Sequence, residues 1–366
     1  MEKDDDIERL RGELDAARSR VAEREAEVAA LRKELRVSRS LLAEKDAAVE
    51  ALYGSFSWRI TAPIRLARKL AVRLFRPRAW SKTIGTPVDA GEMVAAAPRV
   101  CIFAHYDRSS IVSDYVFELL RGISSAGYSI LFVSTAKRIS EPDRERLEPL
   151  CTGLYLRENK GRDLGSWQFG LARLKNLERL DWLLLANDSV FGPFFDLGNM
   201  AGAMERTDAD FWGVTDCYQG KWHLQSYFLC LGGAVVRSET FRDFFARDFA
   251  GLTKRELIDL GEIGLSQALI GAGYQGAAYC PYDALDGGKR EFSRNPLHHY
   301  WDKLITEARC PFVKIELLRD NPFEIPDVDR FREVVSAASG YELDLIEAYL
   351  DRTGAARKTT PPRKTP

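Results

Sequence analysis

Hydrophobic residues recur at every seventh position through the first 52 residues of the chain. A heptad repeat of this kind predicts a coiled coil over residues 1–52. Three polar residues interrupt the second of the two hydrophobic heptad positions (seams), which favours a homodimer over a higher oligomer. The alternative is a single solvated helix. The first seam holds Ile7, Leu14, Val21, Val28, Leu35, Leu42 and Val49, and the second holds Leu10, Ala17, Leu31 and Leu52, with Arg24, Ser38 and Lys45 as the interruptions.

Residues 53–82 form a basic segment that contains eight Lys and Arg residues and no Asp or Glu. On a predicted helix, Ile64 and Leu74 share an apolar face, and Arg68 lies off it. Basic charge opposite an apolar stripe predicts binding to an anionic membrane surface, and the alternative is a helix packed on the following domain. Residues 83–98, with prolines and glycines among small residues, are predicted to be a linker.

From residue 99 to residue 325, short apolar runs alternate with helical patterns. This alternation predicts a single domain with an α/β fold and a mostly parallel sheet. Residues 326–350 are predicted to be a C-terminal helical segment, and the basic residues 351–366 a disordered tail. The strands are predicted at 100–104, 129–133, 153–156 and 182–186, and helices at 112–120, 141–150 and 164–180.

The composition is that of a soluble globular protein, because 45% of the 366 residues are hydrophobic, 29% are charged and the net charge is −1. These values exclude a wholly disordered chain, a collagen-like chain and a multi-span membrane protein. The acidic N-terminus is not followed by an apolar signal region, so we expect a cytoplasmic location. Six cysteines without a C-x-x-C pair predict buried thiols instead of a zinc site or disulfides. No Walker or Rossmann glycine pattern occurs, which argues against a P-loop ATPase or an NAD enzyme, and we expect no nucleic-acid partner.

Three clusters of polar residues each follow the carboxyl end of a predicted strand. Ligands bind at that rim in parallel sheets, so we expect the clusters to converge. They offer carboxylates for a ribose or a metal, backbone amides beside a glycine and an arginine for phosphate, which predicts a nucleotide-sugar site. Taken singly, each cluster also fits a helix cap or a turn. The clusters are His105, Tyr106 and Asp107; Asn159, Gly161, Arg162 and Asp163; and Asn187, Asp188 and Ser189.

Five segments also carry a resemblance to known proteins: Val100–Asp107, Arg157–Asp163, Leu184–Ser189, Asp210–Gly213 and His223–Phe228. In this order they resemble the rhamnan synthesis protein F family of bacterial polysaccharide glycosyltransferases. The resemblance implies a GT-A-like domain that uses a nucleotide-diphosphate sugar, with dTDP-rhamnose as the implied donor. The implied acceptor is a growing cell-surface polysaccharide, such as lipopolysaccharide, or a lipid-linked glycan of the cell envelope.

The resemblance implies a divalent cation as well, since GT-A enzymes usually carry an Asp-x-Asp motif that holds Mg²⁺ or Mn²⁺ against the diphosphate. Here Asn187, Asp188 and Ser189 occupy that place, so only one carboxylate is present. Two alternatives follow. Asp188 holds a hydrated cation with Asn187 and Ser189 as neutral oxygen ligands, or arginine and lysine side chains replace the ion.

The segment from Gly261 onward is similar to the family element in which an acidic pair opens a helix beneath the acceptor. Glu262 is the candidate general base for an inverting transfer, although Ile263 stands where the second acid would be. The alternative is a glutamate that interacts favourably with a helix N-terminus. Aromatic and polar residues are expected to bind the acceptor, and of these we expect the Trp222 side chain to be exposed. They are Trp212, Trp222, His223, Gln225 and Tyr227.

The sequence thus predicts a glycosyltransferase that works at the inner face of the cell membrane as a peripheral protein, with the coiled coil assembling it. The alternative, motivated by the missing acids at Ser189 and Ile263, is a catalytically silent scaffold of this fold in a polysaccharide assembly. A nucleotide-sugar hydrolase or a phosphotransferase that shares the fold is a third hypothesis.

Overall fold

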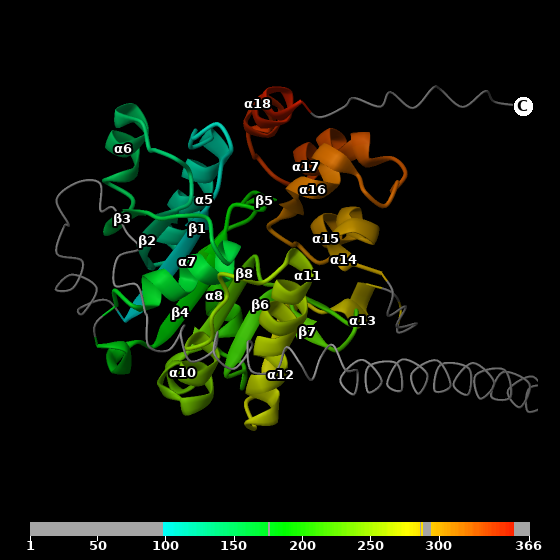
Figure 1. The fold of residues 1–366 in the computed structure, drawn as a ribbon. Helices are drawn as coiled ribbons and strands as arrows, with labels where there is room; N and C mark the ends of the chain where they lie inside the picture. The colour runs from blue at the N-terminus through cyan, green and yellow to red at the C-terminus, as the bar shows by residue number, and fades with distance from the viewer. Residues whose placement is uncertain (1–97, 175, 286, 288–293, 355–366) are drawn as a thin grey trace, which may run out of the picture. The chain divides into compact units, whose positions relative to one another are not determined.

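The computed structural model describes residues 98–174, 176–285, 287 and 294–354 (Figure 1). The predicted coiled coil, the basic segment, all but the last residue of the linker and the tail beyond residue 354 lie outside these residues, so their predictions stay predictions. Among the described residues, no helix combines the length and the apolar character that crossing a bilayer requires.

A central sheet of eight strands organises the described domain, in the order β3-β2-β1-β4-β8-β6-β7 with β9 beside β6. The strands β3, β2, β1 and β4 are parallel, as predicted from the alternation of strands and helices. β8 is antiparallel to both β4 and β6, so the second half of the sheet is mixed. The strands are β1 (Arg99–His105), β2 (Ser129–Ser134), β3 (Gly153–Leu156), β4 (Trp182–Asn187), β6 (Phe211–Cys217), β7 (His223–Leu224), β8 (Phe228–Gly232) and β9 (Gly276–Cys280).

Helices cover both faces of the sheet, which explains why its strands are continuous apolar runs. In β1, Cys101 and Phe103 join one core cluster, and Val100 and Ile102 join the other. The six cysteines are free thiols; five of them are buried, as predicted, and Cys151 is only half-buried. The first cluster includes residues of α5 (Asp114–Ser125), α8 (Leu197–Met204) and α15 (Trp301–Thr306), and the second includes residues of α7 (Arg162–Leu171), α10 (Glu239–Phe245) and α12 (Ile263–Gly271).

Short elements connect these layers. A separate two-stranded sheet pairs β5 (Val190–Phe191) with β10 (Val313–Lys314), so it joins the residues after β4 to a much later part of the chain. The other short elements are α6 (Glu141–Leu147), η1 (Leu177–Arg179), α9 (Gly233–Arg237), α11 (Lys254–Glu256), η2 (Leu257–Glu262), α13 (Tyr282–Leu285), α14 (Pro296–His299), α16 (Ile315–Asp320) and η3 (Val328–Arg330).

The C-terminal helices α17 (Phe331–Ala338) and α18 (Leu343–Thr353), orange to red in Figure 1, belong to the same core as the sheet. Phe331, Val335 and Ile346 are buried in the cluster that also contains residues of α5. The predicted boundary at residue 325 therefore divides one packed unit. The predicted tail also begins too early, because α18 continues through Thr353 and the Arg352 side chain donates to Asp107 Oδ2.

Candidate functional site

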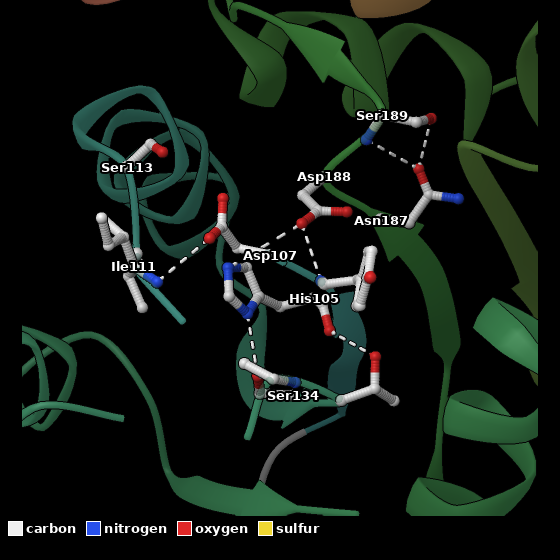
Figure 2. A network of polar contacts seen from close by, with 12 residues as sticks. His105, Asp107, Ile111, Ser113, Ser134, Asn187, Asp188 and Ser189 are labelled. Carbon is white, nitrogen blue, oxygen red and sulfur yellow. Dashed lines mark hydrogen bonds and ion pairs between the residues drawn. The ribbon is translucent and has the colours of Figure 1, made fainter. Parts of the chain in front are cut away.

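The ends of β1 and β4 lie side by side at the carboxyl rim of the sheet, where the backbone N–H of Tyr106 donates to Asp188 Oδ2 at 2.8 Å (Figure 2). His105 Nε2 is 3.9 Å from the same oxygen, and its Nδ1 lies 2.9 Å from Ser134 Oγ. Burial lowers the pKa of His105 to about 4, so this imidazole is neutral at neutral pH. Burial likewise raises the pKa of Asp188 well above its ordinary value.

A chain of hydrogen bonds joins the residues that follow β3 to those at the end of β4. Lys314 Nζ donates to Ser189 Oγ at 3.1 Å, and Ser189 Oγ donates to Asn187 Oδ1 at 2.6 Å. The Asn187 amide then donates to Asp163 Oδ2 at 2.9 Å. An ammonium thus begins the chain and a carboxylate ends it. Asp163 was predicted to share a rim with Asn187 and Ser189, and the structure brings these three side chains together.

Lys314 is the site residue that sequence analysis missed. It comes from β10, more than a hundred residues after the rim clusters, and the β5–β10 pairing places it opposite Val190. Burial lowers the pKa of Lys314, and the negative charges of Glu262, Glu316 and Asp163 act in the opposite direction. The signal in the sequence is a single lysine inside the apolar run from Cys310 to Ile315.

The charge of Lys314 acts on the Glu262 carboxylate, which has two further partners. Ser226 Oγ donates to Glu262 Oε2, and His223 Nε2 lies 3.5 Å from Glu262 Oε1. Burial would raise the pKa of Glu262, but the hydrogen bond and charge of His223, the hydrogen bond from Ser226 and the charge of Lys314 together lower it. The same pairing raises the pKa of His223 against the effect of its burial. Glu262 is therefore ionised at neutral pH, as a general base must be.

Glu262 does not open a helix, contrary to the sequence prediction. The helical stretch begins at Lys254, where the side chains of Thr253 and Glu256 form a reciprocal capping box. Glu262 ends the π-helical segment η2, and α12 continues from Ile263. The alternative reading of Glu262 as a group at a helix N-terminus is therefore wrong. π-Helical turns occur frequently at functional sites.

Asp107 is occupied by structural contacts. Its Oδ1 accepts from the backbone N–H groups of Ser109 at 2.7 Å and Ile111 at 3.2 Å, and the bond to Ile111 is visible in Figure 2. Its Oδ2 accepts from Arg352 Nη2 at 2.7 Å, and the same nitrogen donates to Ser113 Oγ at 2.8 Å. Asp107 thus fixes the loop between β1 and α5 to α18.

We expect Arg352→Ala to lower the free energy of unfolding by about 1–3 kcal/mol, because it leaves the carboxylate of Asp107, only 9% exposed, without its charged partner. Urea unfolding of the full chain measures this change. Arg330→Ala is the matched control, since Arg330 and Glu333 form an exposed pair on the protein surface and its loss should cost less than about 0.5 kcal/mol. Equal effects of the two substitutions would contradict the anchoring role of Arg352.

The remaining predicted rim residues form the turn into α7. Gly161 has a left-handed φ of 72° and Arg162 a φ of 48°, so the chain turns sharply where α7 begins. The side chains of Asn159 and Arg162 are exposed at this turn, and Tyr106 is about half exposed across the rim. These residues are accessible to a ligand.

Most of the predicted acceptor residues lie in the core. Trp212 is fully buried against Phe228, and Gln225 and Tyr227 both bond the hydroxyl of Thr215, at 2.8 and 3.0 Å. Trp212, Gln225 and Tyr227 are therefore packing residues in this structure. Trp222 is half-buried and donates through Nε1 to Asp216 at 2.7 Å, so the expectation that its side chain is exposed is wrong. His223 alone of the five touches Glu262.

The family model of rhamnan synthesis protein F matches residues 130–359, which is more than half of the chain. The chain belongs to this family. The match covers β2 to α18, including Asp163, the end of β4, Glu262 and Lys314. Family membership supports a glycosyltransferase of polysaccharide synthesis.

Two curated relatives are similar in sequence to this member of the rhamnan synthesis protein F family. The virulence protein VirA of Vibrio anguillarum is 28% identical over 297 residues, which cover 73% of this chain and 95% of VirA. The uncharacterized protein y4gN of Sinorhizobium fredii is 28% identical over 218 residues, which cover 58% of this chain and 56% of y4gN.

Among solved structures, the glycosyltransferase GlyE of Streptococcus pneumoniae TIGR4 is 14% identical, with a TM-score of 0.35, over 70% of this chain and 65% of GlyE. The mannosyltransferase PcManGT of Pyrobaculum calidifontis, solved with GDP-Man and Mn²⁺, is 12% identical, with a TM-score of 0.29, over 80% of this chain and 87% of PcManGT. At these scores the structures carry no argument about the site of the rhamnan synthesis protein F member.

The polar groups after β4 do not fit a metal held by several protein ligands. The side-chain oxygens of Asn187 and Ser189 are engaged in the chain from Lys314 to Asp163, and Asp188 Oδ2 accepts from Tyr106. Within the described residues, no three His, Cys, Asp or Glu side chains are grouped closely enough to bind a metal ion. A positive charge is nevertheless present, because the ammonium of Lys314 adjoins Ser189.

Proposed function

We propose that this chain is a glycosyltransferase that moves L-rhamnose from a nucleotide-diphosphate donor to a growing cell-surface polysaccharide or a lipid-linked glycan, with inversion. One observation carries the proposal beyond the family assignment: an ionised carboxylate, Glu262, belongs to the same charged group as the strand rim. The charge of Lys314 acts on the pKa of both Glu262 and Asp163, and the charge of Glu262 acts on the pKa of Asp163, which supports a donor and a base at one site.

The proposed reaction is a single displacement. The acceptor hydroxyl attacks the anomeric carbon, its proton passes to Glu262, and the bond between the sugar and the diphosphate breaks with the electron pair on the diphosphate oxygen. A β-linked activated rhamnose that yields an α-rhamnoside needs this inversion and no protein nucleophile. Ser226 and His223 orient the Glu262 carboxylate for the proton transfer.

A catalytically silent scaffold is the second candidate, and a specific observation favours it. Ile263 stands where the family pattern implies a second acid, and Ser189 stands where it implies a carboxylate. A scaffold has no need of a nucleotide, whereas a glycosyltransferase binds one. Calorimetric titration of the full chain with dTDP, UDP and GDP separates the two candidates, and binding of none of them would reject the glycosyltransferase.

We expect Asp163→Ala and Asp188→Ala to weaken nucleotide binding about tenfold or more each, the effect of losing one hydrogen-bonding carboxyl group. Asp163 ends the chain from Lys314, and Asp188 holds the backbone of Tyr106 at the rim. Calorimetry measures the affinity, and thermal unfolding checks that each variant is folded. Asp208→Ala, at an exposed carboxylate outside the rim, is the matched control. Unchanged affinity in both rim variants would move the nucleotide site elsewhere.

The N-terminal segments enter the proposal as predictions from their sequence. Residues 1–52 would pair two copies of the chain, and residues 53–82 would hold the protein against the anionic inner face of the cell membrane. Both would place the transferase where lipid-linked glycans are extended.

A further inference from the structure

A lysine ammonium stands at the strand rim, in a position fixed by backbone pairing. β10 pairs antiparallel with β5, and the N–H of Ile315 donates to the carbonyl of Ser189 at 3.1 Å. Lys314 and Ser189 therefore cannot separate without breaking this small sheet. The ammonium is also 5.6 Å from the ring centroid of the buried Tyr227, a distance at which an aromatic face attracts a cation.

Carboxylates near this ammonium favour its charged form, and its bond to Ser189 leaves N–H donors for an anion. An ammonium carries three N–H donors, and the bond to Ser189 uses one of them. Burial lowers the pKa of Lys314, and the charges of Glu262, Glu316 and Asp163 act against that lowering. Arg162, exposed at the start of α7, adds a second positive charge that acts on Asp163.

We propose that Lys314 receives the diphosphate of the sugar donor in place of a divalent cation, so that this chain binds its nucleotide without a metal. The inference rests on the proposed function. Lysine binds phosphate as a point charge, and the oxygens of Asn187 and Ser189 are already engaged as hydrogen-bond partners. When the bond to the sugar breaks, the electron pair remains on the diphosphate oxygen, and the ammonium of Lys314 faces the added negative charge.

The test is calorimetric titration of the full chain with dTDP, UDP and GDP, once in EDTA and once with Mg²⁺ or Mn²⁺. We expect the wild-type protein to bind the same nucleotide with equal affinity in both conditions. Lys314→Met should weaken that binding at least tenfold, and Lys314→Arg, which keeps the charge, should retain part of it. Lys303→Met, at an exposed lysine on α15, is the matched control and should bind as the wild type does.

The outcomes separate this inference from the proposed function. Binding that requires Mg²⁺ or Mn²⁺ would overturn the role of Lys314 and leave the glycosyltransferase standing, as would undiminished binding by a folded Lys314→Met protein. Absence of nucleotide binding both in EDTA and with Mg²⁺ or Mn²⁺ would overturn both proposals. The comparison of EDTA with metal uses only the wild-type chain, so it decides the question even if Lys314→Met does not fold.

Discussion

Glu262→Gln is expected to lower the turnover of sugar transfer by about two to four orders of magnitude, the usual contribution of a general base. The substitution keeps the size of the side chain and its capacity to accept from Ser226, and it removes the basic carboxylate. The affinity for the nucleotide should change little, because no donor contact is removed. The measurement is release of nucleoside diphosphate under saturating donor and acceptor, with calorimetry for the nucleotide.

Two other carboxylates make the control for this experiment informative. Asp259 lies on the same π-helical segment but is exposed and within 3.7 Å of Arg255, so Asp259→Asn should retain wild-type turnover. Asp216 accepts from Trp222 Nε1 at 2.7 Å and from the N–H of Tyr282 at 2.6 Å, which leaves it engaged in structure. A Glu262→Gln protein with near-wild-type turnover would show that the base is one of these or lies elsewhere.

The parallel half of the fold could be predicted from sequence because its strands are buried on both faces and read as uninterrupted apolar runs. The position of the polar rim could be predicted as well, since residues at the carboxyl ends of neighbouring parallel strands lie at the same edge of the sheet. The antiparallel direction of β8 was not predicted. β8 lies between β4 and β6 in the sheet, and no crossover helix before it indicates in the sequence where it inserts.

Long-range contacts account for the site residues that sequence analysis missed or misplaced. Lys314 reaches Ser189 across 125 positions, and Arg352 reaches Asp107 across 245. Local patterns carry no information about such pairs, and a basic residue near the end of the chain is read as solvated. Trp212 was misplaced because its local pattern is ambiguous. An aromatic residue beside a polar cluster can stack on a sugar or pack in the core, and only its burial in the structure distinguishes the two.

The turn into α7 connects the packing of the fold with the rim, and Gly165 is the residue that permits it. A Cβ added at Gly165 would lie 2.1 Å from the backbone carbonyl oxygen of Lys160 and 2.9 Å from Arg157 Nη2. Arg157 itself donates to that carbonyl at 2.6 Å and to Ser166 Oγ at 3.2 Å. Because the obstructing atom belongs to the backbone, a side-chain rotation cannot relieve the clash.

Gly165→Ala is therefore expected to lower the free energy of unfolding by about 1–3 kcal/mol, the usual cost of forcing a methyl group into a packed position. It should also weaken nucleotide binding, because displacing Lys160 shifts the turn that holds Asp163 and Arg162 at the rim. Gly202→Ala is the matched control: in α8 the added Cβ would be 3.4 Å from Arg206 Nη1, so alanine should be neutral or stabilise the helix by up to about 1 kcal/mol. Urea unfolding and calorimetry measure the two effects separately. A Gly165→Ala protein as stable as the wild type would show that the turn adapts, and lost stability with unchanged nucleotide affinity would show that the turn supports the fold without positioning the ligand.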